Sequence, residues 1–216
     1  MELSDQKEWC DRLDAGAKQL GVELDQSQCE LLWRYAHLLR ERNEHVNLTS
    51  ITSAEGILTL HMLDSLTVAP HLGDAARILD VGTGGGFPGV PLAVAFPQRK
   101  FTLIDGTAKK IRFVEESVAA LDIRNVHVAH ARAESYTGSK DFDVIVARAV
   151  GPLADFVHNA SGLLAPGGRL FAMKGRSPEE ELRALPRGWR TEVIDLAVPG
   201  LDAERRLVIV SRQRAA

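Results

Sequence analysis

The sequence predicts an α/β fold: a mostly parallel seven-stranded sheet with an antiparallel C-terminal strand, preceded by an N-terminal helical extension. From residue 77 on, short apolar runs alternate with helical patterns, which is typical of parallel strands joined by helical crossovers. A glycine-rich turn directly follows the first of these runs. The length of 216 residues suits one buried core better than two full domains. We therefore expect residues 1–72 to form the extension and residues 73–216 to form the sheet with its helices.

The N-terminal extension is predicted to be helical throughout. Residues 5–20 form the first expected helix, and a second follows Asp25 or Ser27, each of which has a glutamine or glutamate three residues later. A polar turn at residues 47–49 leads into a third helical stretch that ends near Pro70.

Seven runs rich in apolar residues supply the predicted strands. They lie at residues 77–81, 101–104, 126–129, 142–147, 169–173, 190–196 and 205–211. Helices are expected at residues 88–96, after Thr107, at 155–164 and at 178–185. The short connection at Pro199-Gly200 predicts antiparallel pairing of the last two strands.

Composition and charge exclude several classes of protein. No apolar run is long enough to span a bilayer, and the N-terminal residues lack the pattern of a signal peptide, so we expect a cytoplasmic protein. Cys10 and Cys29 have no metal-site spacing, so no metal is expected. The net charge is −3, but residues 169–216 hold ten basic and seven acidic residues, which indicates either a face that meets phosphates or an ordinary charged surface.

The run from Asp80 to Gly89, DVGTGGGFPG, is the strongest motif of the chain. It joins a predicted strand to a predicted helix, where glycines permit positive φ angles and let a ligand approach the backbone closely. The spacing Gly84-x-Gly86-x-x-Gly89, with Asp105 following Gly84 by 21 residues, satisfies the dinucleotide fingerprint. A nicotinamide-dependent oxidoreductase is therefore one alternative.

The acid near the end of the first strand favours S-adenosylmethionine instead. Gly82 begins the tight turn and Asp80 precedes it. A carboxylate there repels a pyrophosphate but attracts the α-ammonium group of a bound amino acid. We therefore expect the turn to hold S-adenosylmethionine and Asp105 to bind its ribose hydroxyls. Asp105 could instead cap the helix that begins near Thr107.

The end of the fourth predicted strand, Ala147-Arg148-Ala149-Val150, lacks the groups that difficult methyl acceptors require. It has no Asn/Asp-Pro-Pro-aromatic tetrad of the kind that enzymes methylating exocyclic amines carry, and no cysteine for covalent attack on a pyrimidine. An acceptor that is already nucleophilic, such as N7 of guanine, needs no general base. The reaction would then depend on positioning and electrostatics.

The ordered motifs from Asn47 to the C-terminus resemble those of one family, the bacterial small-subunit ribosomal RNA guanine-N7 methyltransferases known as RsmG or GidB. The resemblance rests on these pieces: Asn47-Leu48-Thr49, His61-x-x-Asp64-Ser65, the glycine-rich turn, Lys109-Lys110-x-x-Phe113, Arg132-Ala133-Glu134, Ala147-Arg148-Ala149 and Met173-Lys174-Gly175. Phe87 stands where the family often has leucine.

The resemblance implies a cytoplasmic enzyme with a Rossmann-like S-adenosylmethionine-dependent methyltransferase fold. It would methylate one guanine of 16S rRNA, either free or in the small ribosomal subunit, without a metal or a membrane, and we expect a monomer. The residues expected to bind the cofactor are Gly82, Gly84, Phe87, Asp105, Ala133, Glu134 and Arg148. Those expected to bind the substrate are Asn47, His61, Arg132 and Lys174, with Arg148 and Lys174 positioning the reactants. Candidates for phosphate contacts are Arg176, Arg183, Arg187, Arg190, Arg205 and Arg206.

Structural roles compete with several of these assignments. Arg148 could pair with Asp143 or Asp155, and His61 and Asp64 could bond each other because they are three residues apart on a helical stretch. Lys174 could simply extend its charge to solvent at a strand end. A non-catalytic RNA-binding protein with a vestigial cofactor site is a further alternative.

Overall fold

The computed structural model describes residues 5–149, 151–175 and 178–213. Its seven strands form one sheet in the order β3-β2-β1-β4-β5-β7-β6. The strands are β1 Arg77–Val81, β2 Lys100–Asp105, β3 Val126–His130, β4 Phe142–Arg148, β5 Leu164–Lys174, β6 Trp189–Leu196 and β7 Arg205–Arg212. The strands β1 to β5 pair in parallel, and β7 pairs antiparallel with β5 and β6. The predicted sheet and its reversed C-terminal strand are confirmed.

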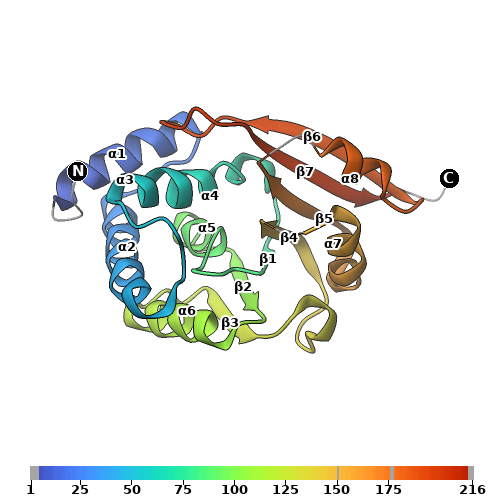
Figure 1. Ribbon diagram of the computed structural model, residues 1–216, viewed down its shortest axis with the longest axis horizontal. Helices are drawn as coiled ribbons and strands as arrows, with labels where there is room; N and C mark the ends of the chain where they lie inside the picture. The colour runs from blue at the N-terminus through green and yellow to red at the C-terminus, as the bar shows by residue number, and fades with distance from the viewer. Residues whose placement is uncertain (1–4, 150, 176–177, 214–216) are drawn as a thin grey trace.

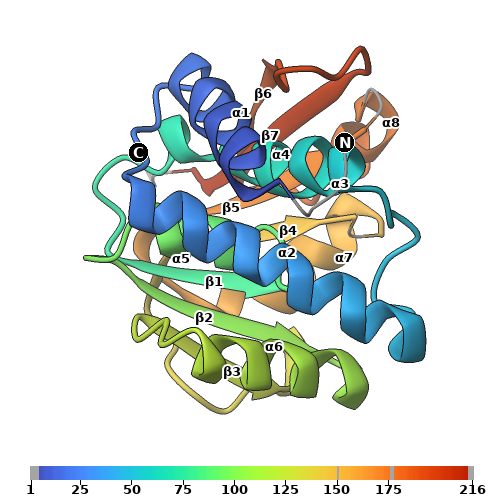
Figure 2. The same cartoon turned by 90° about the vertical axis from the view of Figure 1, so that its left-hand side faces the viewer.

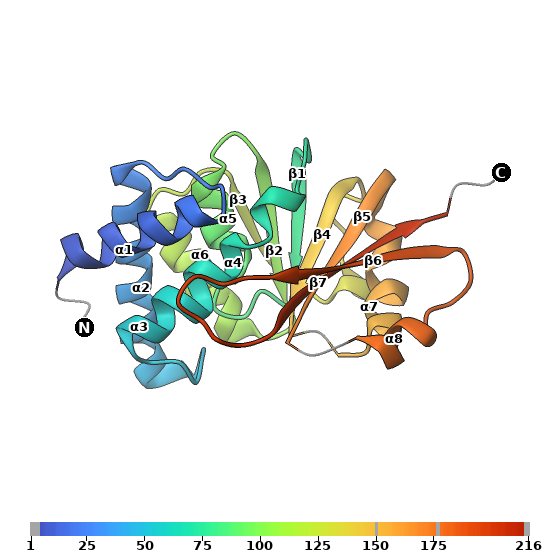
Figure 3. The ribbon, with the colours of Figure 1, turned by 90° about the horizontal axis from the view of Figure 1, so that it is seen from above.

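Helices cover both faces of this sheet. They are α1 Gln6–Gln19, α2 Gln26–Val46, α3 Ala54–Gly56, α4 Asp64–Leu66, α5 Gly89–Ala95, α6 Ala108–Ala120, α7 Leu153–Ala160 and α8 Glu179–Arg183. Short 3₁₀ turns lie at Ala69–His71 (η2), Ala133–Ser135 (η3) and Ser161–Leu163 (η4), and Ile57–Leu63 (η1) is a π-helix. Helices α1, α2, α5 and α6 lie on one side of the sheet and α7 and α8 on the other (Figure 3).

The side chains of the strands alternate between two hydrophobic cores, as the period of a β-strand requires. Ile78 and Val144 face the core that α1, α2, α5 and α6 cover, while Leu79 and Ile145 face the core under α7. Helix α2 runs across the first face, in front of α5 (Figure 2). The N-terminal extension therefore forms the outer layer on one face of the sheet. Helices α1 and α8 lie toward opposite ends of the long axis of the molecule (Figure 1).

Local capping explains where α2 begins. Asp25 is the N-cap: its side chain accepts the Gln28 N–H at 2.8 Å, and the Gln28 side chain accepts the Asp25 N–H at 2.8 Å. Ser27 donates its hydroxyl to Asp25 at 2.6 Å. Of the two predicted caps, Asp25 is therefore the one used.

Three predicted boundaries are wrong: both ends of helix α7 and the start of strand β5. The helix expected at residues 155–164 begins earlier, at Leu153, and ends at Ala160. Leu164 already pairs with Phe142, so β5 starts before the predicted residue 169 and runs on through Pro166-Gly167-Gly168, and its register with β4 shifts between Phe142 and Val144. Strand pairing with β4 overrides the turn-forming residues at this point.

Candidate active site

A pocket of about 470 Å³ opens at the carboxyl ends of β1, β2 and β3. Its walls also include η3 and the start of α7, and it is lined by Val81, Gly82, Asp105, Gly106, Thr107, Ala131, Arg132, Ala133, Glu134, Gly151, Pro152, Asp155, Phe156 and Asn159. The chain reverses its direction of winding between β1 and β4, and ligands of open α/β sheets bind outside the strand ends at such a switch point. The pocket has the volume of an ordinary small-molecule site.

The glycines of the turn that follows β1 meet different surroundings. Gly82 has a φ of +71° and lines the pocket, and no atom lies within 4 Å of a Cβ added there. A Cβ at Gly86 would collide with the Tyr35 hydroxyl of α2, and one at Gly89 would lie 2.7 Å from Leu103. Gly86 and Gly89 thus permit close packing, whereas Gly82 keeps the pocket open.

Asp80 is completely buried and ties the turn together. Its Oδ2 accepts the Thr83 hydroxyl at 2.6 Å and the Gly89 N–H at 2.8 Å. Burial raises the pKa of Asp80 to about 6, although both hydrogen bonds act in the opposite direction. Asp80 is not among the residues that line the pocket. Oδ2 of Asp80 therefore shapes the turn from inside, whereas Oδ1 is buried without a hydrogen-bond partner among the described residues, and the expected attraction of a ligand ammonium group stays a prediction.

Asp105 makes the bond to the start of α6 that the sequence offered as an alternative, and its binding of ribose hydroxyls stays a prediction. It lines the pocket, and its Oδ1 accepts the Thr107 N–H at 2.7 Å at the start of α6. Its Oδ2 accepts the Gly84 N–H at 3.0 Å and so fixes the glycine-rich turn against β2. Thr107 occupies the N-cap position of α6, but its side chain makes no capping bond. Because each carboxylate oxygen has more than one lone pair, these bonds leave Asp105 acceptor capacity for a ligand.

The remaining wall of the pocket is more acidic than basic. Asp105, Glu134 and Asp155 line it together with one cation, Arg132. Ala133 is buried beside them in η3 and offers an apolar surface. This lining suits a ligand with hydroxyl groups and a positive charge, and it disfavours the pyrophosphate of a dinucleotide.

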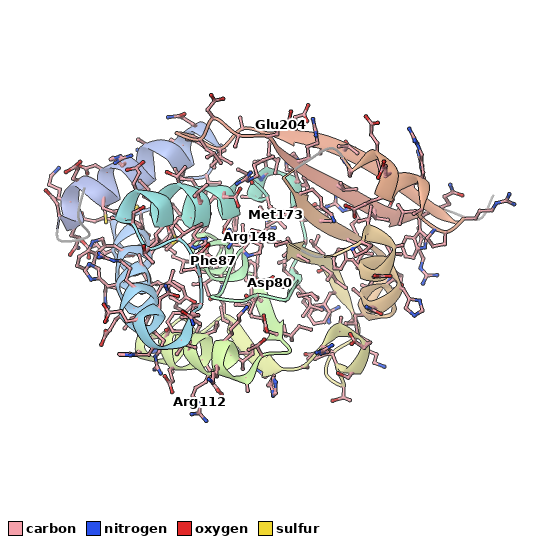
Figure 4. The ribbon with its side chains drawn as sticks, viewed as in Figure 1. Asp80, Phe87, Arg112, Arg148, Met173 and Glu204 are labelled. Carbon is pink, nitrogen blue, oxygen red and sulfur yellow. The ribbon has the colours of Figure 1, made fainter. Side chains whose placement is uncertain are left out.

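A second cluster lies beside the turn, formed by His61, Phe87 and Arg148. The His61 and Phe87 rings stack with centroids 4.4 Å apart, and the Arg148 guanidinium lies 5.2 Å from the Phe87 centroid. Figure 4 shows Phe87 and Arg148 side by side near the middle of the molecule. Nδ1 of His61 lies 3.2 Å from Nη2 of Arg148 and 3.1 Å from the Leu60 carbonyl, and Nε2 lies 2.9 Å from the Thr49 hydroxyl, so both ring nitrogens are engaged within the protein.

His61 is neutral in this environment. Burial, followed by the nearby Arg148 charge, lowers the pKa of His61 to about 3. Arg148 also donates to the Leu60 carbonyl at 2.8 Å and pairs with Asp64 at 3.2 Å. The predicted pairing of Arg148 with Asp143 or Asp155 is therefore wrong, and so is a bond between His61 and Asp64: in the structure both contact Arg148 instead.

Comparison with known proteins decides the family. A family model described as GidB, rRNA small subunit methyltransferase G, matches residues 28–209, which is most of the chain. The chain belongs to this family. A curated relative from Nitrosococcus oceani, named ribosomal RNA small subunit methyltransferase G, is 45% identical over 94% of this chain and 95% of its own length. A relative of the same name from Methylococcus capsulatus is 46% identical over 90% and 95%.

Solved structures show the fold alone, because they are more distant. An S-adenosylmethionine-dependent O-methyltransferase from Thermotoga maritima superposes with a TM-score of 0.57 at 17% identity, covering 82% of this chain and 73% of that one. TrmN from Thermus thermophilus gives a TM-score of 0.55 at 21% identity, covering 72% and 53%. The Rossmann-like methyltransferase fold of this rRNA small subunit methyltransferase G family member is thereby confirmed.

Asn47, one of the family's motif residues, has a clear backbone role. It ends α2 with a φ of +52°, a left-handed conformation that asparagine tolerates better than most residues. It is exposed, while the nearby Asn43 side chain holds both the N–H and the carbonyl of Thr49 at 2.9 Å. The predicted contact of Asn47 with substrate stays a prediction.

Lys174 ends β5 and is engaged within the protein. Its ammonium donates to the Gly151 carbonyl at 2.8 Å and to Glu181 of α8 at 2.7 Å, and its side chain is 10% exposed. Glu181 also accepts the Leu153 N–H at 2.7 Å. Lys174 therefore supports the segment that forms one wall of the pocket, and its predicted contact with substrate remains a prediction.

The six arginines proposed for phosphate contacts separate into groups. Arg205 pairs with Asp64 at 3.0 Å, and Arg206 pairs with Asp195 and Glu204, so both have acidic partners that the sequence did not predict. Arg183, Arg187 and Arg190 are exposed, whereas Arg176 lies outside the described residues.

In the described part of the chain no helix is long and apolar enough to cross a membrane, and no group of three or more metal-ligating side chains occurs.

Proposed function

We propose that this chain transfers the methyl group of S-adenosylmethionine to N7 of a guanine in 16S ribosomal RNA. The observation that carries the proposal is the pocket at the carboxyl ends of β1, β2 and β3, with Arg148 at the carboxyl end of the neighbouring strand β4. Family membership supports rRNA of the small subunit as the substrate class.

The lining of the pocket fits the cofactor. Gly82 leaves room where any side chain would project into the pocket. Asp105 offers a carboxylate to the ribose hydroxyls, and Ala133 and Glu134 are the lining residues that would flank the adenine. When bound, S-adenosylmethionine supplies a methyl group on a positively charged sulfur, which is already activated for transfer. The acidic lining favours that positive charge over a dinucleotide.

Guanine N7 has a free lone pair, so its methylation requires placement of the base rather than removal of a proton. The residues of the cluster agree with this requirement. His61 has a pKa near 3 and is enclosed by Thr49, Phe87 and Arg148, so it is a neutral structural group at pH 7. Arg148 keeps a side chain that is 21% exposed, so its guanidinium can donate to phosphate or sugar oxygens of the RNA and leave N7 of the guanine free for the methyl group. We assign Arg148 to positioning the acceptor.

The test is methyl transfer by the intact protein. Small ribosomal subunits and free 16S rRNA are incubated with labelled S-adenosylmethionine, and the labelled base is identified after digestion. We expect label in 7-methylguanine of 16S rRNA. Label in another base would overturn the acceptor, and RNA binding without any transfer would favour the non-catalytic alternative. Tight NADH binding without S-adenosylmethionine binding would favour the oxidoreductase.

We also propose a cytoplasmic location, because rRNA is modified where ribosomes assemble, and a monomeric enzyme. Gel filtration with light scattering tests the oligomeric state, for which we expect the mass of one 23.6 kDa chain.

A further inference from the structure

One buried carboxylate joins three distant parts of the chain at the edge of the candidate site. The Asp64 side chain is 3% exposed, and each of its oxygens has an arginine partner. Oδ2 lies 3.2 Å from Nη1 of Arg148, and Oδ1 lies 3.0 Å from Nε of Arg205. A buried carboxylate without such partners is very costly, so this arrangement is strongly constrained.

The backbone around Asp64 is held in place as well. Asp64 follows the π-helix η1, a rare conformation that recurs at functional sites, and its carbonyl accepts the Thr67 hydroxyl at 2.6 Å. The two arginines come from the sheet, at its carboxyl edge. Arg148 ends β4 and pairs in register with Met173, which pairs in turn with Leu207, two residues after Arg205. Asp64 therefore connects the N-terminal extension to two strands at the edge where the pocket opens.

Asp64 is the charged partner that defines the position of Arg148. Among the described residues, the other hydrogen-bonding groups beside the Arg148 guanidinium are neutral: the Leu60 carbonyl and the His61 ring. Arg205 is held similarly, by Asp64 and by the carbonyl of Glu204. Two guanidinium groups share the Asp64 carboxylate, and the charge of Arg148 also interacts with buried Asp80. The two arginine side chains stay 21% and 26% exposed, so their remaining N–H groups can donate to oxygen atoms of an RNA acceptor.

We propose that Asp64 is a positioning residue for methyl transfer: by pairing with Arg148 and Arg205 together, it holds Arg148 against Phe87 in the orientation that places the acceptor base. This inference rests on the proposed function and deepens it. Asp64 does not touch the substrate itself, so its effect on the rate is exerted through Arg148.

The experiment is a double-mutant cycle on kcat with small ribosomal subunits as substrate. Asp64→Asn keeps the shape of the side chain but removes its charge, and Arg148→Lys keeps a charge but loses the planar fork. We expect Asp64→Asn to lower kcat by about 10- to 100-fold, since misplacement by about 1 Å has effects of that size. The Kd for S-adenosylmethionine, measured by calorimetry, should stay within about twofold. In the Arg148→Lys background Asp64→Asn should lower kcat no further.

The matched control is Asp195→Asn, which removes a carboxylate that also pairs with an arginine of β7 but is 85% exposed. Its kcat should equal that of the wild type. If Asp64→Asn and Arg148→Lys multiply their effects on kcat, or if Asp64→Asn acts only on cofactor binding, the proposal is overturned. If Asp64→Asn does not fold, Arg205→Lys replaces it in the same cycle with the same expectation.

Failure of the proposed function has a different signature. In that case the wild type itself transfers no methyl group to rRNA. The double-mutant cycle of Asp64→Asn and Arg148→Lys is then measured on the free energy of unfolding. If the two substitutions are not coupled in that measurement, the contact between Asp64 and Arg148 is rejected as well.

Discussion

Single residues of the glycine-rich turn have separable tasks. Gly86 and Gly89 permit contact with α2 and β2, and Asp80 bonds the turn from within. Gly82 alone among these borders the pocket. Substitutions at Gly86, Gly89 or Asp80 should therefore affect the stability of the protein, and substitutions at Gly82 should affect ligand binding.

Gly82→Val should abolish S-adenosylmethionine binding, because its side chain would extend into the pocket. Gly21 provides a matched control, since it has the same φ of +71°, no atom within 4 Å of an added Cβ, and a position between α1 and α2. Both valine variants should lose about 1–2 kcal/mol of stability from the left-handed backbone. Calorimetry should show cofactor binding only for Gly21→Val; equal affinities would contradict this account of Gly82.

Asn47→Gly separates the backbone role of Asn47 from a role in binding. Glycine adopts the φ of +52° readily, so the melting temperature should not fall. If the predicted substrate contact exists, KM for small ribosomal subunits should rise severalfold while the Kd for S-adenosylmethionine stays the same. An unchanged KM would assign Asn47 to ending α2.

His61 should make the protein less stable in acid. Its pKa is about 3 in the folded protein, whereas the ordinary pKa of a histidine is 6.5, so between these values the unfolded chain binds a proton and stability is lost as pH falls below 6.5. Between pH 6.5 and 5 the loss attributable to His61 is about 2 kcal/mol, at about 1.4 kcal/mol per pH unit. Asp80 acts in the opposite direction, because its pKa of about 6 lies above the ordinary value of 3.8. Urea unfolding of the wild type and of His61→Gln at pH 6.5 and pH 5 measures the contribution of His61. If the free energy of unfolding falls equally in both proteins, His61 is not the cause of the acid sensitivity.

At the scale of elements, polar residues define where helix α2 begins and ends and tie its first turn to α5. Its capping box starts it at Asp25, and the Gln28 amide donates to the Val94 carbonyl at 2.7 Å, which ties α2 to α5. The left-handed Asn47 ends it. The orientation of α2 over the turn, where Tyr35 donates to the Gly85 carbonyl at 2.9 Å, depends on these bonds.

Asp25→Ala should lower the free energy of unfolding by about 1 kcal/mol, because the first turn of α2 loses its cap. Ser27→Ala removes only a hydroxyl that donates to Asp25 and should cost less. Urea denaturation of the two variants tests the order, and a larger loss for Ser27→Ala would be inconsistent with the observed cap.

At the scale of the whole molecule, the extension and the sheet share one core. The first hydrophobic cluster runs from Trp9, Tyr35 and Leu66 to Ile78 and Leu103 without a break. The division of the chain at residue 72 stays a prediction, but its two parts are not independent in packing.

A fragment of residues 73–216 should therefore fail to fold cooperatively. Removing the extension would expose the apolar face of α5 and α6 and would leave Arg148 and Arg205 without Asp64. Near-UV circular dichroism and thermal melts of the fragment test this, with the full chain as control. A sharp melting transition of the isolated fragment would show an independent domain.

Short-range patterns along the chain were sufficient to predict the parallel sheet, its reversed last strand, the place of the glycine-rich turn and the family. These patterns are the alternation of apolar residues along strands, glycines at a strand end, and ordered motifs. Of the residues expected to bind the cofactor, Gly82, Asp105, Ala133 and Glu134 line one pocket, because the carboxyl ends of neighbouring parallel strands meet at one edge. Gly84, Phe87 and Arg148 are not among its lining residues, and the binding roles of all seven stay predictions.

The pairing of charged side chains, in contrast, is visible only in the folded chain. Asp64 meets Arg148 and Arg205, which are 84 and 141 residues away, and buried Asp80 accepts hydrogen bonds from Thr83 and Gly89 within the turn. A pattern of neighbouring residues does not predict such partners, because an ion pair forms only where the packing of the fold brings two distant elements together. The difference is one of range: backbone preference and hydrophobic period act over a few residues, whereas burial of charge is settled by the whole fold.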